Sequence, residues 1–274
     1  MQQTRGVFFL SDRTGITAET LGNMLLTQFD GVQFERFTLP FINSRQKAAE
    51  AVTRINAYAR MAGRAKPLVF STAVDDDVRV LLQAVDGVFI DFFDAFIARL
   101  EKTLGTRASH SIGLAHGINP GTYYRRIEAV NYALAHDDGV SMRNYGNADV
   151  ILLAPSRCGK TPTCLYLGLQ YGIYAANVPL TEEIFESGRL PPEVLAQKSK
   201  LYGLTTEAER LSEIRSERLP NSRYASVEQC RQEIYETDCI FRSLGIKALN
   251  TARMSVEEIA TVILQDMGLK SLAR

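Results

Sequence analysis

The chain has 274 residues and a mass of 30.5 kDa, enough to bury one large core or two modest ones. Hydrophobic residues make up 46% of it, a share typical of a folded globular protein and too high for a disordered one. Basic and acidic residues both number 31, so the formal net charge is zero, which argues against general attraction to nucleic acid or to an anionic membrane.

Short apolar runs alternate with helical periodicity through the N-terminal third of the chain. Its first predicted helix places Leu21, Met24, Leu25 and Phe29 on one face. The strand–helix alternation predicts a mainly parallel sheet covered by helices. The predicted strands are 6–10, 32–39 and 67–72, and the predicted helices are 16–29, 44–63 and 75–85.

A stretch rich in glycine and small polar residues, 105–122, breaks this rhythm and marks the expected domain boundary. We therefore expect an N-terminal α/β domain at 1–104 and a C-terminal α/β domain at 105–274. Ser255 and Glu258 are spaced as a capping box at the start of the last helix. Further strands are predicted at 149–154, 173–180 and 247–252, and further helices at 123–139, 160–172 and 226–245.

One predicted strand of the second domain leads directly into a glycine-containing turn and a helix. The segment reads ADVILLAPSRCGKTPT, and it follows the phosphate-binding pattern G-x-x-x-x-G-K-[ST] at every fixed position but the first. In that pattern backbone N–H groups and a helix N-terminus surround the phosphates, a lysine neutralises their oxygens, and a hydroxyl ligates Mg²⁺. The candidate binding residues are Ala154, Pro155, Ser156, Arg157, Cys158, Gly159, Lys160 and Thr161.

Two residues of this turn depart from the pattern and one adds to it. Ala154 stands where a glycine normally supplies freedom at positive φ, and Pro155 lacks an N–H donor. The planar guanidinium of Arg157 suits phosphoryl oxygens, so Arg157 is a further candidate ligand. A chance match in an ordinary strand-to-helix turn is the alternative, but the flanking strand and helix favour a true phosphate site.

SDRTGITAET, residues 11–20, follows the first predicted strand, at the end of the strand where α/β sheets place their ligands. Asp12, Thr14 and Gly15 are candidates to bind a phosphate or a substrate hydroxyl. The other interpretation is a simple turn in which Thr17 caps the next helix.

AHDDG, residues 135–139, places two carboxylates ahead of the strand that leads into the turn. A carboxylate there, from Asp137 or Asp138, could orient Mg²⁺ or accept a hydroxyl proton. A solvated helix end capped by Gly139 explains the same residues without function.

The segment 198–223 mixes basic and acidic residues. Such a pattern predicts a solvated helix with i,i+4 charge pairs. The subset nearest Pro220 could instead close over phosphates as a mobile lid. The basic residues are Lys198, Lys200, Arg210, Arg215, Arg218 and Arg223.

The four cysteines show no CxxC spacing, and the apolar run near the N-terminus is too short for a secretory signal. Reduced thiols and a cytoplasmic location are therefore expected. The most apolar later run, VFIDFFDAFIARL, is interrupted by Asp91 and Asp94, so no membrane span is predicted.

Together these motifs resemble a known family, the phosphoenolpyruvate synthase regulatory proteins, which are grouped with the pyruvate, phosphate dikinase regulatory proteins as bifunctional kinase–pyrophosphorylases. The likeness runs over nearly the whole chain, and SRCGKTPT followed by AAN-x-P is specific to the group. SRCGK, LAHDDG and NSRYAS favour the synthase branch over the dikinase branch. The turn reads APSR where the family usually has GVSR, and Arg13 stands where the family usually has a small residue.

The resemblance implies two opposed reactions at a threonine of a target enzyme, with phosphoenolpyruvate synthase as the implied partner. One reaction transfers the β-phosphoryl group of ADP to the threonine, leaves AMP, and inactivates the target. The other uses inorganic phosphate to remove that group as pyrophosphate and restores activity. The implied nucleotide site is the turn itself, residues 154–161.

Each candidate residue has an expected role in this chemistry. Lys160 and Arg157 would stabilise charge on the transferring group, and Thr161 would help to hold Mg²⁺. A carboxylate, with Asp138 and Asp12 as the candidates, would orient the threonine hydroxyl. ADP and inorganic phosphate would compete for one turn. The sequence leaves open whether the active unit is a homodimer.

Other functions are compatible with parts of the same pattern. A conventional ATP-dependent P-loop kinase or NTPase is one, although no apolar run ending in aspartate follows the turn. A non-catalytic module that senses nucleotide and binds the synthase is another. The same bifunctional chemistry directed at pyruvate, phosphate dikinase is the third.

Overall fold

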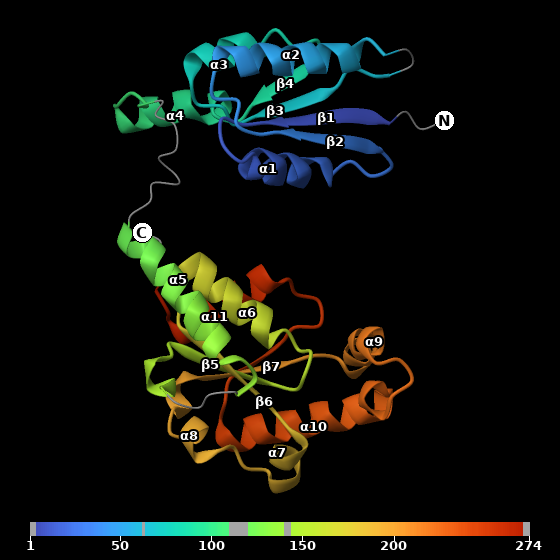
Figure 1. Cartoon of the computed structure of the whole chain (residues 1–274), viewed down its shortest axis with the longest axis vertical. Coiled ribbons are helices and arrows are strands. Elements are labelled where there is room, and N and C mark those ends of the chain that lie inside the picture. The colour runs from blue at the N-terminus through green and yellow to red at the C-terminus, as the bar shows by residue number, and fades with distance from the viewer. Residues whose placement is uncertain (1–3, 62–63, 110–119, 140–143, 271–274) are drawn as a thin grey trace. The chain divides into compact units, whose positions relative to one another are not determined.

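The computed structural model describes residues 4–61, 64–109, 120–139 and 144–270 of the chain. The chain divides into two compact units, Met1–Gly117 and Ile118–Arg274, and each carries a four-stranded parallel sheet in its described residues (Figure 1). The expected α/β class with mainly parallel sheets is therefore confirmed. The domain limits 1–104 and 105–274 stay a prediction, because most of the segment 105–122 lies outside the described residues.

The N-terminal unit arranges its sheet in the order β2-β1-β3-β4, with parallel pairing throughout. Asp75 caps the third helix of this unit by accepting a hydrogen bond from the Val78 N–H, and Ser44 caps the second in the same way. The elements are β1 (Arg5–Leu10), α1 (Ile16–Leu26), β2 (Phe34–Leu39), α2 (Arg45–Ala59), β3 (Leu68–Ser71), α3 (Asp76–Leu82), β4 (Val88–Asp91) and α4 (Asp94–Leu104).

The core of this unit follows from the alternation of side chains along β1. Phe8 and Leu10 pack on one face with residues of α2 and α3, whereas Val7 and Phe9 pack on the other face with α1. All four side chains are buried because helices cover both faces, as parallel sheets require.

The apolar face predicted for α1 points to solvent, which corrects the prediction from periodicity. Ala18, Gly22 and Leu26 are the buried residues of α1, and a Cβ atom at Gly22 would lie 2.4 Å from the Phe9 ring. Aromatic rings on the sheet fill the space against α1, so only small residues fit on its inner face. The predicted face is exposed: Leu21 by 39%, Met24 by 63%, Leu25 by 48% and Phe29 by 60%.

The C-terminal unit arranges its sheet in the order β6-β5-β7-β8, again with parallel pairing throughout. Its elements are α5 (Pro120–Ala135), η2 (Asp137–Gly139), η3 (Tyr145–Asn147), β5 (Val150–Ala154), α6 (Lys160–Tyr166), η4 (Leu167–Tyr171), β6 (Ala175–Pro179), α7 (Glu182–Ser187), α8 (Pro192–Leu195), η5 (Lys198–Lys200), β7 (Leu201–Thr205), α9 (Ala208–Arg218), η6 (Arg223–Ala225), α10 (Val227–Leu244), β8 (Ala248–Asn250) and α11 (Val256–Met267).

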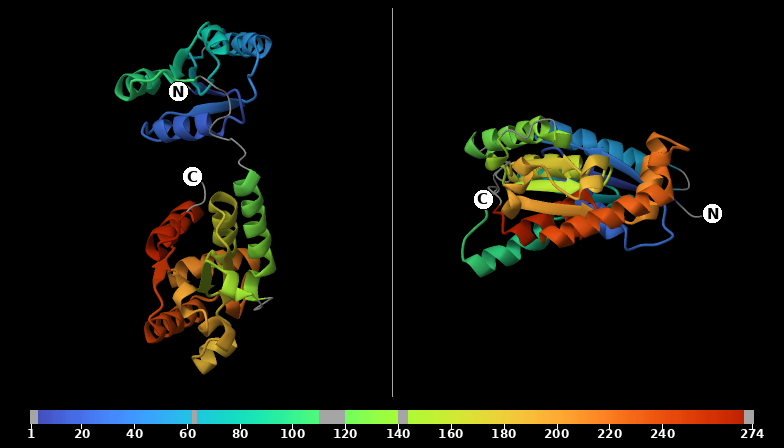
Figure 2. Two further views of the ribbon diagram at one scale, coloured as in Figure 1. Left: turned by 90° about the vertical axis from the view of Figure 1, so that its left-hand side faces the viewer. Right: turned by 90° about the horizontal axis from the view of Figure 1, so that it is seen from below.

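β5 lies inside this unit with all five residues buried. Val150 and Leu152 contribute to a core with α5, α6 and α11, while Ile151 and Leu153 contribute to a second core with α7, α8 and α10. The helices that share the first core gather on one face of the sheet, and α10 and α7 lie on the other (Figures 1 and 2). The capping box of Ser255 and Glu258 at the start of α11 is present as predicted.

One central strand, β7, is missing from the sequence-based prediction. The charges of 198–223 predict a solvated helix, but LYGLT at 201–205 forms a buried strand between β5 and β8. Within this strand only glycine fits at position 203, because a Cβ atom there would lie 2.5 Å from the Phe241 ring of α10. A five-residue apolar run between charged segments carries too weak a periodic signal to identify such a strand.

In both sheets the order in which strands are added reverses at a corresponding strand. The chain moves from the first strand of each sheet to one side, and then crosses to the other side of that strand. Open α/β sheets bind ligands outside the carboxyl ends of the strands at this reversal. SDRTG follows β1 in one unit and APSRCG follows β5 in the other, so the two polar turns occupy equivalent positions in their sheets.

Candidate functional site

The turn between β5 and α6 has a backbone suited to surround an anion. φ is +75° at Arg157 and +84° at Gly159, and it is not positive at Ser156 or Cys158. Alternation of the sign of φ turns successive N–H groups toward one side, which is the geometry of an anion-binding nest. Lys160 begins α6 directly after Gly159, so the partial positive charge of a helix N-terminus adds to the nest.

The two departures from the phosphate-binding pattern lie at the strand end of the turn. Ala154 is the last residue of β5, is fully buried, and pairs with Pro179 of β6 without positive φ. The conformation of the strand therefore requires no glycine at this position. Pro155 follows it and supplies a carbonyl rather than an N–H group to the turn.

Lys160 is buried, with 4% of its surface exposed, and its ammonium group lies inside the turn. Nζ donates hydrogen bonds to the carbonyl oxygens of Ala154 (3.2 Å) and Pro155 (3.1 Å). It lies 4.0 Å from Oδ1 of Asp138. Burial lowers the pKa of Lys160, and the Asp138 carboxylate opposes that shift. A buried ammonium with only partial compensation is an electrostatic arrangement typical of functional sites.

A hydrogen-bonded network joins the start of α6 to η2 and β6. Thr161 Oγ1 donates to Oδ1 of Asp137 at 2.7 Å, and the side-chain amide of Asn177 donates to the same oxygen at 2.6 Å. The Asn177 side-chain oxygen accepts a bond from the Asp138 N–H at 2.9 Å. The fully buried Asn177 thereby fixes both aspartates beside the turn.

Asp138 occupies a different position in this network from its neighbour Asp137. Its backbone is left-handed, with φ of +49°, and its side chain is 63% exposed. The carboxylate faces Lys160 and lines a cavity of about 440 Å³ together with Pro179 and Thr181. Asp138 is therefore accessible from solvent, whereas Asp137 is committed to the start of α6.

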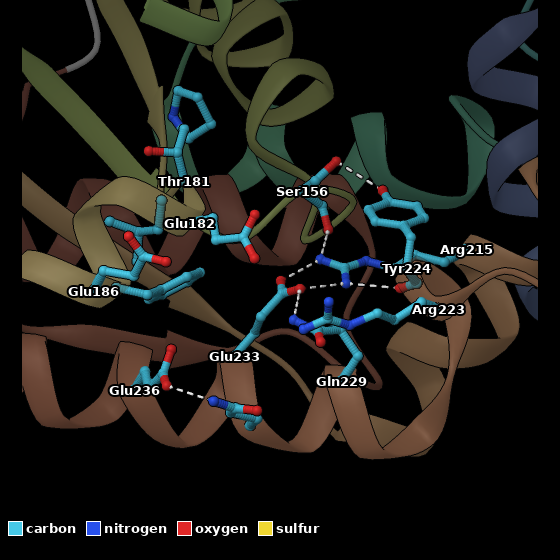
Figure 3. Close-up of a pocket in the computed structure, with 14 residues that line it drawn as sticks. Ser156, Thr181, Glu182, Glu186, Arg215, Arg223, Tyr224, Gln229, Glu233 and Glu236 are labelled. Carbon is cyan, nitrogen blue, oxygen red and sulfur yellow. Dashed lines mark hydrogen bonds and ion pairs between the residues drawn. The ribbon is translucent and has the colours of Figure 1, made fainter.

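The opposite side of the turn is held by a buried ion pair (Figure 3). Arg215 of α9 is fully buried and donates to the Ser156 carbonyl oxygen at 3.2 Å. Its two terminal nitrogens bind the carboxylate of Glu233 on α10 at 3.0 and 2.6 Å. Tyr224 donates its hydroxyl to Ser156 Oγ at 2.9 Å, and its ring lies 4.2 Å from the Arg215 guanidinium. Arg215 is thus a fixed support of the turn and not part of a lid.

Cys158, within the turn, is buried, and burial raises the pKa of its thiol to about 12. A thiol with that pKa stays protonated near neutral pH and is a poor nucleophile. Cys158 belongs to the same buried hydrophobic cluster as Cys164 of α6 and Cys230 of α10. The side chain therefore packs the turn onto the core.

Asp12 lies in the N-terminal unit, after β1. Its side chain is buried and its Oδ2 atom accepts a hydrogen bond from the Val74 N–H at 3.3 Å. Gly15, at φ of +85°, precedes α1, and Thr17 lies within that helix and does not cap it. The structure therefore brings Arg157, Lys160, Thr161 and Asp138 together in the C-terminal unit, with Asp12 in the other unit.

Sequence reasoning chose Asp138 over Asp137 as the candidate carboxylate, but it missed Asn177 and the contact of Asp137 with Thr161. The motif AAN-x-P contains Asn177, but only its burial beside two aspartates in β6 reveals its contribution. Within the described residues, no group of three or more His, Cys, Asp or Glu side chains could hold a metal by itself. No helix in the part of the chain that the structure describes is both long enough and apolar enough to cross a membrane.

Comparisons with known proteins match almost the entire chain. A family model described as "Kinase/pyrophosphorylase" matches residues 7–264. A protein of Alkalilimnicola ehrlichii named "Putative phosphoenolpyruvate synthase regulatory protein" is 53% identical over 267 residues, which cover 97% of each chain. Proteins of the same name from Legionella pneumophila strain Corby (covering 97% of this chain and 98% of theirs) and Bordetella pertussis (97% of each) are 49% identical over 267 residues.

Proposed function

The chain belongs to the kinase/pyrophosphorylase family, a family of bifunctional phosphotransferases, and from this we propose that it regulates phosphoenolpyruvate synthase by reversible phosphorylation of a threonine. In the kinase direction the threonine hydroxyl attacks the β-phosphorus of ADP; AMP leaves, and the hydroxyl proton is released. In the reverse direction inorganic phosphate attacks the phosphothreonine, and the products are pyrophosphate and the free threonine. The observation that carries the proposal is the buried Lys160 ammonium inside an N–H nest at a helix N-terminus.

The turn supplies what phosphoryl transfer mainly requires, which is positioning and neutralisation of charge. We assign the binding of the transferring phosphoryl group to the N–H groups of the turn and to Lys160 and Arg157. Lys160 already faces the turn, and its partners among the described residues are two carbonyl oxygens and a carboxylate, so phosphate oxygens can replace the carbonyl contacts. The same nest accepts either the β-phosphate of ADP or inorganic phosphate, because both present anionic oxygens on a tetrahedral phosphorus.

Mg²⁺ is part of the proposal, and the residues present fit it. Thr161 Oγ1 donates a hydrogen bond to Asp137, which leaves the hydroxyl lone pairs available to a cation. Asp137 and Asp138 add hard oxygen donors of the kind that Mg²⁺ prefers. With so few protein ligands, the ion would be shared with phosphate oxygens, and when bound it neutralises charge on the phosphates.

The proton of the threonine hydroxyl needs an acceptor. Asp138 is our first candidate because it is exposed, lines a cavity, and lies 4.0 Å from Lys160, beside the transferring group. Asp12 remains a second candidate from the equivalent turn of the N-terminal unit. Substitution of each by Asn separates them: loss of the kinase rate with unchanged ADP affinity identifies the acceptor.

The proposal also includes a cytoplasmic location with the synthase and a homodimeric active unit. The exposed apolar side chains of α1, among them Met24 and Leu25, support a surface that associates with another chain. Sedimentation equilibrium of the full chain tests the assembly.

One experiment tests the function directly. The purified protein is incubated with phosphoenolpyruvate synthase, ADP and Mg²⁺, and the synthase is searched for phosphothreonine by mass spectrometry. Inorganic phosphate is then added, and pyrophosphate is measured. Pyruvate, phosphate dikinase as target and ATP as donor are the comparison arms. Transfer from ATP but not from ADP, or a synthase that never gains a phosphoryl group, would refute the proposal.

A further inference from the structure

A cavity of about 570 Å³ opens beside the turn, and Ser156 is one of the residues that line it (Figure 3). Its walls are the end of β6, the helix α7, the short helix η6 and one side of α10. The volume lies in the range of cavities that bind small molecules or a few residues of a peptide. Ser156 belongs to the turn, so the cavity borders the turn on the side where Arg215 and Tyr224 contact it.

The charges that line the cavity are mostly negative. Arg215 and Glu233 neutralise each other as a buried pair. The other charged residues that line the cavity are Glu182 and Glu186 of α7, Glu236 of α10 and Arg223, which is three carboxylates and one guanidinium. Within the described residues, none of these three carboxylates forms an ion pair, and Glu236 accepts only a hydrogen bond from the Gln232 amide.

This charge distribution separates two kinds of ligand. Phosphate groups are attracted to the turn and repelled by an acidic wall, so the phosphates of a nucleotide lie over the turn and not in this cavity. The cavity favours a neutral or positively charged occupant. Phe185 and Tyr224 add aromatic surface to its lining, which suits the methylene groups of lysine and arginine side chains.

A buried polar atom of a lining residue also indicates a binding site. Arg215 is fully buried, and its Nε atom has no hydrogen-bond partner among the described residues. An unpaired buried donor destabilises the folded chain, and an acceptor oxygen from an occupant would satisfy it. Arg215 also contacts the Ser156 carbonyl, so the same side chain joins the cavity to the turn.

We propose that this acidic cavity binds a positively charged segment of the target protein, placing the segment's threonine beside the phosphoryl group on the turn. The inference rests on the proposed function for the identity of the reaction, but the docking itself does not require catalysis. The carboxylates of Glu182, Glu186 and Glu236 attract lysine or arginine residues of that segment. Ser156 marks the place where the segment meets the turn.

The test is the double substitution Glu182→Lys/Glu186→Lys. Both side chains are exposed on α7, so the variant should fold. The matched control is Glu193→Lys/Glu228→Lys, which makes the same change in charge at exposed residues outside the cavity. We expect KM for the target protein to rise roughly tenfold or more in the first variant, because like charges then face each other. KM for ADP should stay within about twofold of the wild type, as should both constants in the control.

Calorimetric titration of the target protein into each variant, without nucleotide, makes the two proposals separable. Weaker binding in the cavity variant alone supports docking even if no phosphoryl transfer occurs, an outcome that would refute only the proposed function. Unchanged target affinity overturns the docking proposal. A rise in KM for ADP with unchanged target affinity also overturns it, since the cavity would then hold the nucleoside. Increasing salt should weaken target binding by the wild type more than by the cavity variant.

Discussion

Replacement of Lys160 by Met should stabilise the protein while abolishing its phosphate chemistry. The ammonium is 4% exposed, and replacing buried charges by apolar groups of similar volume is often neutral or stabilising by about 1–4 kcal/mol. The Ala154 carbonyl keeps a hydrogen bond from the Leu180 N–H at 2.9 Å. The Pro155 carbonyl loses its hydrogen-bond donor, which costs about 1 kcal/mol. We therefore expect a net gain of about 0–3 kcal/mol in the free energy of unfolding.

Urea denaturation of the wild type and of Lys160→Met measures this difference, with Lys198→Met as the matched control. Lys198 is exposed, so its substitution should change the free energy of unfolding by no more than about 0.5 kcal/mol. Affinity for ADP, measured by calorimetry, should fall roughly 10- to 100-fold in Lys160→Met, because a charge-assisted contact to phosphate is lost. A loss of stability above about 1 kcal/mol would contradict the reasoning that burial of this charge is costly.

The pH dependence of the same pair of proteins has a definite sign. Burial lowers the folded-state pKa of Lys160 below its ordinary value of 10.5. Between the two pKa values the unfolded chain therefore binds more protons than the folded protein, and stability rises with pH. The free energy of unfolding of the wild type, relative to Lys160→Met, should increase as pH rises toward 10.5 and fall as pH decreases through the lowered pKa. If the difference in the free energy of unfolding between the two proteins did not change with pH, the Lys160 ammonium would be in a solvated environment.

Three further substitutions follow from the contacts around the turn. Asp137→Asn keeps an acceptor for the Thr161 hydroxyl but removes the charge. The Mg²⁺ concentration that gives half the maximal kinase rate should therefore rise, while the melting temperature changes little. An unchanged Mg²⁺ requirement would exclude Asp137 from the cation site. Glu233→Gln leaves the buried Arg215 with a neutral partner and should cost about 3–5 kcal/mol in urea denaturation, and a cost below about 1 kcal/mol would show that the pair is solvated. Cys158→Ala should retain the kinase rate, because the protonated thiol takes no part in transfer. A thiol reagent should inactivate the variant no faster than the wild type, and loss of the rate with retained folding would contradict this.

The strand and helix on either side of the turn, and the position of the turn, could be predicted because both depend on local signals. The buried strand before Ala154 is one continuous apolar run, and Gly159 and Lys160 mark the start of α6. Small residues at Ala18 and Gly22 could not be predicted to face the sheet, since this depends on the aromatic rings of a strand distant in the sequence.

The network around Thr161 lay beyond sequence reasoning for a related reason. Asp137 and Asn177 are separated by 40 residues and meet only because β5 and β6 pair in parallel. Nothing in AHDDG indicates that Asp137 binds the start of α6 while Asp138 stays exposed. The buried role of Arg215 is equally hidden, because its segment carries the charge pattern of a solvated helix.

Competition between ADP and inorganic phosphate is the most direct test of the central claim that one turn binds both. ADP is titrated calorimetrically into the protein at increasing phosphate concentrations, for the wild type and for Lys160→Met. We predict that the apparent Kd for ADP rises in proportion to phosphate in the wild type and that both ligands bind weakly to the variant. Simultaneous binding of ADP and phosphate without mutual exclusion, or full affinity for both in Lys160→Met, would contradict the account.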